Sequence, residues 1–142
     1  MGYTGRCACG QVTLAIWAEP IGTRQCWCRQ CRQIGGGGPT HNAIFPAETV
    51  QIAGAVGAAS WTGASGNRLT FHFCPECGTQ VYAQSSARMH LRSVRIGMLN
   101  EPHDLKPQMA IWTEEAPDWA VIDPELEQWP RQPPAPVLPQ PG

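Results

Sequence analysis

Cys74-Pro75-Glu76-Cys77-Gly78 has the spacing of a zinc knuckle. Two cysteines three positions apart can ligate one tetrahedral ion through bonds of about 2.3 Å. Pro75 fixes φ early in the turn, and Gly78 permits a left-handed closing conformation. A redox Cys-x-x-Cys motif normally starts a helix in a βαβ unit, whereas this stretch lies between two strand-like runs. We therefore interpret it as half of a metal site.

A second pair of cysteines, Cys7 and Cys9, lies in the stretch Cys7-Ala8-Cys9-Gly10. In an extended chain, residues two positions apart project from the same face, so both thiolates can reach one ion. A structural Zn²⁺ ion takes four protein ligands, and its binding contributes about 10 kcal/mol or more to folding. We predict one closed structural zinc site, formed by Cys7, Cys9, Cys74 and Cys77.

The remaining cysteines form the cluster Cys26-Trp27-Cys28-Arg29-Gln30-Cys31. Three protein ligands with an open fourth position are typical of a catalytic zinc site, and a three-thiolate site favours a soft donor such as another thiolate. We predict that Cys26, Cys28 and Cys31 hold the second of two Zn²⁺ ions per chain. Two alternatives stay open: three thiols without metal, or a closed site completed by a histidine. The candidate histidines are His41, His72, His90 and His103.

Composition predicts a loop-rich, mainly β protein with short turns and little helix. The 142 residues suffice for one domain with its own core, only 15% are charged, and 15 glycines and 14 prolines interrupt regular structure. These values exclude a coiled coil and a polybasic tail. We place the domain at residues 1–129 and an extended proline-rich tail at 130–142, because proline removes hydrogen-bond donors from a helix or sheet. Strands are predicted at 12–16, 49–52, 69–73, 79–82 and 91–96, and residues 109–112 suit a short strand or a helical turn.

The charge distribution and the absence of long apolar runs indicate the partners and the location. Residues 1–100 carry eight arginines and three glutamates, whereas residues 101–142 carry two basic and eight acidic residues. The basic half permits a small anionic substrate, but one lysine and no recurring aromatic–basic pattern argue against nucleic acid. No apolar run reaches the eighteen or so residues of a membrane helix, and the first residues lack a secretory signal. We therefore expect a cytoplasmic protein whose cysteines stay free of disulfides; the sequence does not predict an oligomeric state.

Three motifs in this order resemble one known family. They are Gly5-Arg6-Cys7-Ala8-Cys9-Gly10, Cys26-Trp27-Cys28-Arg29-Gln30-Cys31-Arg32 and Phe73-Cys74-Pro75-Glu76-Cys77-Gly78-Thr79. Over about residues 3 to 130 the chain resembles the glutathione-dependent formaldehyde-activating enzymes, also called the centromere-protein-V-like family. The resemblance implies a small zinc-centred β-tent fold with a Cys₄ structural ion and a three-cysteine active-site ion. It also implies a carbon–sulfur lyase that joins formaldehyde and glutathione to S-hydroxymethylglutathione. The chain departs from the family pattern at Trp27 and in the glycine run 35–38.

We expect a substrate thiol to become a thiolate at the zinc of Cys26, Cys28 and Cys31, and to attack formaldehyde there. Arg29 and Arg32 flank these ligands, and a planar guanidinium group holds a glutathione carboxylate well; both also suit an ordinary protein surface. Two other functions fit the same residues. One is a non-catalytic zinc module that binds a protein or a thiol, and the other is a disulfide oxidoreductase.

Overall fold

The structure is a computed structural model that describes residues 2–63 and 65–137. Strands dominate it, as predicted. The strands are β1 (Tyr3–Arg6), β2 (Thr13–Ile16), β3 (Gly22–Cys26), β4 (Thr40–Pro46), β5 (Val50–Ala53), β6 (Gly57–Thr62), β7 (Arg68–Phe73), β8 (Gln80–Ser85), β9 (Leu91–Arg95), β10 (Met109–Ile111) and β11 (Glu127–Gln128). The helical elements are α1 (Arg29–Ile34) and the 3₁₀ turns Ala47–Thr49, Ile96–Met98 and Thr113–Glu115. No helix in the described part of the chain is long and apolar enough to cross a membrane.

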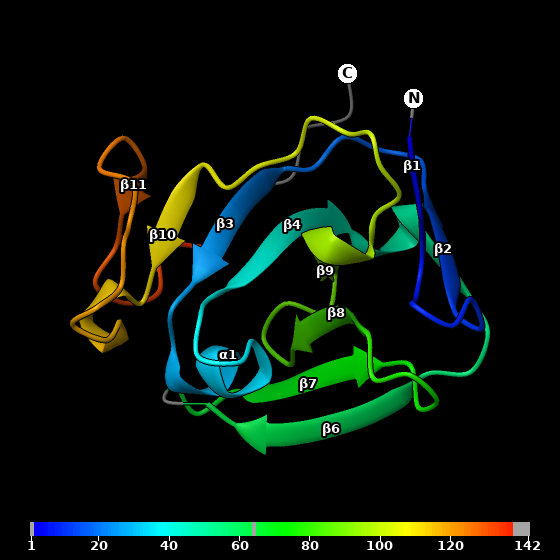
Figure 1. Cartoon of the computed structure of the whole chain (residues 1–142), viewed down its shortest axis with the longest axis horizontal. Helices are drawn as coiled ribbons and strands as arrows, with labels where there is room; N and C mark the ends of the chain where they lie inside the picture. Colours follow the sequence, from blue (N-terminus) through cyan, green and yellow to red (C-terminus); the bar gives the residue numbers. More distant parts are fainter. Residues whose placement is uncertain (1, 64, 138–142) are drawn as a thin grey trace.

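The strands form two sheets. One has the order β1-β2-β5, and the other has the order β11-β10-β3-β4-β9-β8-β7-β6 (Figure 1). In the view of Figure 1, β3 and β4 lie above β7 and β6, with α1 between them and the smaller sheet at the right. Side chains from β3, β4, β9, β8 and β7 line one cavity, so the larger sheet is curved and this face is concave.

The strand β4 has buried side chains on both faces of the larger sheet. It lies between β3 and β9, and nearly all of its side chains are buried. Ala43 and Phe45 belong to the main hydrophobic core, which also contains residues of the smaller sheet such as Leu14. Asn42 and Ile44, which alternate with them, line the cavity on the opposite face. One face of the sheet therefore carries the core, and the other carries the candidate site.

The strand predictions agree with the structure in five regions, which correspond to β2, β5, β7, β8 and β9. The region 109–112 is largely strand, because β10 covers Met109–Ile111. The sequence patterns did not predict β1, β3, β4, β6, β11 or the helix α1. The division at residues 129 and 130 stays a prediction; residues 138–142 of the predicted tail lie outside the described part.

Candidate metal centres and the adjoining cavity

Four cysteines from two distant parts of the chain meet beside the smaller sheet. Cys7 directly follows β1, and Cys74 directly follows β7. The sulfur atoms of Cys7, Cys9, Cys74 and Cys77 all lie within 4.8 Å of one another. The Sγ–Sγ distances are 3.6 Å for Cys7–Cys9 and 3.7 Å for Cys9–Cys74. Ligands 2.3 Å from a tetrahedral ion are about 3.8 Å apart, so this group fits a metal ion.

The two halves of the four-cysteine group have similar turns. The N–H of Gly10 donates to the carbonyl of Cys7 at 3.1 Å, and the N–H of Gly78 donates to the carbonyl of Cys74 at 2.8 Å. Both glycines have positive φ, 84° and 78°. The N–H of Val12 points at Cys7 Sγ at 3.2 Å, a contact that stabilises a thiolate. The backbone therefore preorganises these four sulfur atoms.

The other three cysteines meet where β3 passes into α1. Cys26 is the last residue of β3, Cys28 directly precedes α1, and Cys31 lies within the helix. Their sulfur atoms also lie within 4.8 Å of one another, and in residues 2–63 and 65–137 no histidine or carboxylate joins them. Cys26 and Cys31 are buried, whereas Cys28 is partly exposed. This group can hold a metal ion with three ligands from the chain.

Within both groups the thiols shift one another's pKa. Hydrogen bonds to Thr79 lower the pKa of the Cys77 thiol to about 5. Hydrogen bonds from Cys26 and Cys28 lower the pKa of the Cys31 thiol, and the charge of Arg95 adds to this effect. Hydrogen bonds with Cys28 and Cys31, together with burial, raise the pKa of the Cys26 thiol. Each group thus contains at least one thiol whose pKa is lowered, which favours the thiolate, the form that binds a cation.

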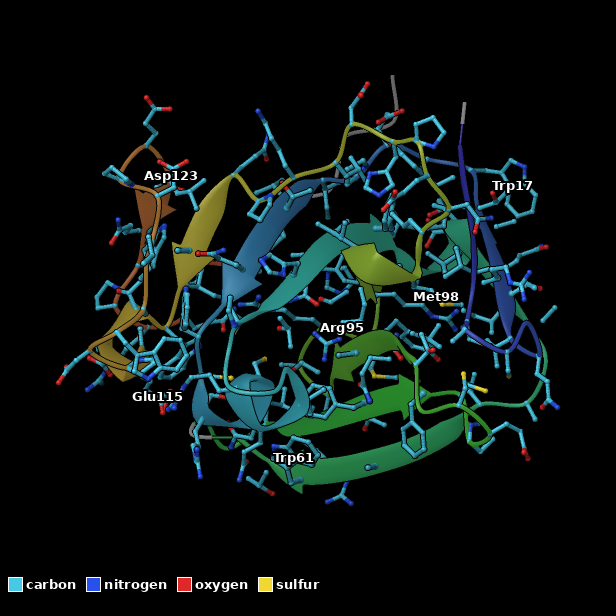
Figure 2. All side chains as sticks on the ribbon, viewed as in Figure 1. Trp17, Trp61, Arg95, Met98, Glu115 and Asp123 are labelled. Atoms are coloured by element: carbon cyan, nitrogen blue, oxygen red, sulfur yellow. The ribbon has the colours of Figure 1, made fainter. Side chains whose placement is uncertain are left out.

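The three-cysteine group opens onto a cavity of about 350 Å³. Apolar side chains such as Phe71, Leu91 and Ile111 line part of it, and Arg24, Asn42 and Arg95 line another part. Figure 2 shows Arg95 in the interior of the molecule, above the strand that carries Trp61. None of the four-cysteine group lines this cavity. The two metal candidates therefore differ in access to space large enough for a small ligand.

The arginines predicted to bind glutathione lie in different surroundings. Arg29 is exposed and lines the cavity. Arg32 does not line it, and its Nε donates to the carbonyl oxygen of Trp27 at 3.0 Å. Trp27 is buried, and its indole Nε1 donates to Gln25 Oε1 at 3.1 Å. The ligand-binding role of Arg29 and Arg32 stays a prediction.

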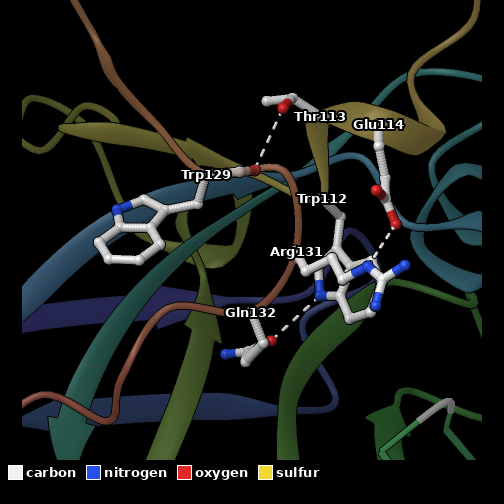
Figure 3. Close-up of polar contacts among 6 residues, drawn as sticks. All are labelled: Trp112, Thr113, Glu114, Trp129, Arg131 and Gln132. Carbon is white, nitrogen blue, oxygen red and sulfur yellow. Dashed lines mark hydrogen bonds and ion pairs between the residues drawn. The ribbon is translucent and has the colours of Figure 1, made fainter.

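The segment after β11 contacts the residues that follow β10 (Figure 3). Trp112 Nε1 donates to Gln132 Oε1 at 3.1 Å, and both residues line the cavity. Thr113 Oγ1 donates to the carbonyl of Trp129 at 3.1 Å, and Arg131 pairs with Glu114 at 2.8 Å. The first residues of the predicted tail are therefore attached to the turn after β10.

Sequence patterns did not identify Arg24 and Arg95, which are buried beside the three-cysteine group. Arg24 belongs to no recognised motif, and Arg95 begins the stretch Arg95-Ile96-Gly97-Met98-Leu99, which also resembles the family but for which no role was predicted. Their burial follows from the pairing of β3, β4 and β9, and two of these strands were not predicted. The available signals were the position of Arg24, two residues before the candidate ligand Cys26, and the place of Arg95 at the start of that stretch.

Comparison with known proteins gives a family and a fold. The family model described as glutathione-dependent formaldehyde-activating enzyme matches residues 2–115. No curated protein matches the chain. A crystal structure of a Rhodobacter sphaeroides protein is similar with a TM-score of 0.55 and 21% sequence identity, over 70% of this chain and 90% of that one. This likeness supports the fold alone.

Proposed function

We propose, from the premise that this chain belongs to the glutathione-dependent formaldehyde-activating enzyme family, that it is a zinc-dependent carbon–sulfur lyase. Its substrates would be a small thiol such as glutathione and formaldehyde. The product would be S-hydroxymethylglutathione or a related adduct. The observation that carries this proposal is the three-cysteine group at the wall of a cavity of about 350 Å³.

The two cysteine groups would have different tasks. Cys7, Cys9, Cys74 and Cys77 would hold a structural Zn²⁺ ion, because four thiolates complete a tetrahedral site. Cys26, Cys28 and Cys31 would hold a second ion whose fourth position faces the cavity. When bound there, zinc would lower the pKa of a substrate thiol, so that the thiol is a nucleophile at neutral pH.

The residues of the cavity would bind and orient the two substrates. In the addition, the sulfur–carbon bond forms, the carbonyl π bond of formaldehyde breaks, and the thiol proton ends on the former carbonyl oxygen. The apolar side chains of Phe71, Leu91 and Ile111 would exclude water from the carbonyl carbon. We also propose a cytoplasmic location, since all seven cysteines are free and a reducing compartment keeps them so.

The test is the variant Cys28→Ala with glutathione and formaldehyde as substrates. We expect the wild type to contain two zinc ions per chain, one for each cysteine group. Cys28→Ala should lose nearly all rate enhancement over the spontaneous reaction, retain one ion and keep its circular dichroism spectrum. Exchange NMR with ¹³C-formaldehyde measures the rate, and elemental analysis measures the zinc.

A second variant supplies the control for this test. Ser86→Ala removes a surface hydroxyl that accepts from the N–H of Arg68. Ser86 lies outside the cavity lining and outside both cysteine groups, so this variant should leave rate and zinc content unchanged. A Cys28→Ala protein with full lyase activity would refute the catalytic assignment. A wild type that binds glutathione without accelerating the addition would instead favour a non-catalytic zinc module.

A further inference from the structure

Three polar side chains form a row across the concave face of the larger sheet. Arg24 on β3 pairs in register with Asn42 on β4, and Asn42 pairs with Arg95 on β9. Directly paired residues project from the same face, so the three side chains are neighbours inside the cavity. Each has only 6% of its surface exposed.

The two arginines in this row have hydrogen-bond donors without acceptors. Arg95 Nη1 donates to Asn42 Oδ1. In the described part of the chain, Arg95 Nε, Arg95 Nη2 and Arg24 Nε have no partner. The guanidinium of Arg95 also lies over the ring of Phe71, 5.2 Å from its centroid. Because a buried charged donor without an acceptor is costly, these atoms favour an acceptor that enters the cavity.

The charge around the cavity favours an anion as that acceptor. Among the described residues, no carboxylate forms an ion pair with Arg24 or Arg95. The ion pair that these residues do form, Arg131–Glu114, lies at the surface. The cavity lining contains two further arginines and one acid, Glu115. Three thiolates with one Zn²⁺ ion carry a net charge near −1, which offsets only one of the two buried guanidinium groups. The four arginines that line the cavity therefore outnumber the negative charges beside them.

We propose that Arg24 and Arg95 form an anion-binding subsite, and that the substrate thiol carries a carboxylate that accepts their free N–H groups. This inference rests on the proposed function for the thiol end of the substrate. A guanidinium fork matches a carboxylate in a planar, bidentate arrangement. Arg24 and Cys26 are two residues apart on one face of β3, about 7 Å along the strand. One small molecule can therefore contact both the subsite and the three-cysteine group.

The test uses ligands that differ in one group, with the zinc-loaded protein. 4-Mercaptobutanoate has a thiol and a carboxylate, its primary amide is a neutral isostere, and 4-hydroxybutanoate lacks the thiol. Calorimetry measures their dissociation constants. We expect 4-mercaptobutanoate to bind the wild type at least about tenfold more tightly than the amide, since the charged hydrogen bonds are lost in the amide.

Single substitutions test which residues cause the preference for 4-mercaptobutanoate over its amide. Arg24→Gln and Arg95→Gln should each weaken 4-mercaptobutanoate about tenfold and leave the affinity for the amide unchanged. Arg24→Lys, which keeps the charge, should retain part of the preference. Arg68→Gln is the matched control, because Arg68 is exposed on β7 and outside the cavity lining, and it should bind both ligands like the wild type.

The wild type alone can overturn the inference, so it stays testable if a variant fails to fold. Equal affinity for the acid and the amide would refute the anion subsite and leave the proposed function intact. A preference that survives both glutamine variants would also refute it. If neither thiol binds but 4-hydroxybutanoate binds in an Arg24-dependent manner, the subsite is supported and the proposed function fails.

Discussion

Gly78 occupies a backbone conformation that other residues adopt only at a cost. Its φ is 78°, and its N–H closes the turn that contains Cys74 and Cys77. A Cβ atom at this position would meet nothing within 4 Å, so space does not require a glycine there. The requirement comes from the left-handed backbone alone.

A pair of alanine variants separates backbone strain from crowding. Gly78→Ala should lower the free energy of unfolding by about 1–2 kcal/mol, because an L side chain disfavours positive φ. Gly97→Ala is the matched control: a Cβ there also meets nothing within 4 Å, but its φ is not positive. It should leave stability unchanged or slightly higher. Urea unfolding with excess zinc measures both, and equal losses would contradict this explanation.

Residue identity and spacing predicted which cysteines lie together, but not the arginines beside them. A metal-binding group leaves a local signature, such as Cys74 and Cys77 three positions apart. Arg24 and Arg95 are 71 positions apart and become neighbours only through Asn42 on the strand between them. Such a contact depends on strand order, which local spacing does not contain. The roles of the cysteines as ligands stay predictions.

At the scale of single elements, apolar alternation predicted strands that have one buried face. The strand β2 alternates in this way and was predicted. By contrast, β3 carries Arg24 on its cavity face, so it lacks an apolar pattern. The helix α1 has six residues, too few for a helical period to be visible. The sequence patterns therefore missed β3 and α1, because β3 carries polar side chains on a buried face and α1 is too short to show a period.

The opposite faces of the larger sheet predict different effects for two buried phenylalanines. Phe45 is fully buried in the main core, whereas Phe71 lines the cavity and contacts Arg95. Phe45→Ala should lower the free energy of unfolding by about 3–5 kcal/mol, because it leaves a void in the core. Phe71→Ala should destabilise less, since its ring already borders open space, but it should weaken 4-mercaptobutanoate binding.

Urea unfolding and calorimetry on both variants check this separation. The affinity of Phe45→Ala for 4-mercaptobutanoate should equal that of the wild type under conditions where the variant is folded. If the two substitutions weaken binding equally, the two faces do not have separate tasks.

In the whole molecule, the two cysteine groups belong to different hydrophobic clusters. Cys7 and Cys74 are part of the main core, together with residues of both sheets. Cys26 and Cys31 form a smaller cluster with Ile111, which Trp129 and neighbouring side chains cover. The four-cysteine group also joins segments 64 residues apart, whereas the three-cysteine group lies within six consecutive residues. Loss of metal should therefore have different consequences at the two groups.

Chelator-driven zinc release should occur in two phases. The first ion should leave the three-cysteine group with little change in circular dichroism, because that group opens onto the cavity and constrains only a short segment. The second should leave as the protein unfolds, because the four-cysteine group links β1 to β7 within the main core. Zinc release to a colorimetric chelator, recorded with far-ultraviolet circular dichroism, resolves the phases. Cys28→Ala should show the second phase alone, and a single phase that coincides with unfolding in the wild type would contradict the division into an open and a closed site.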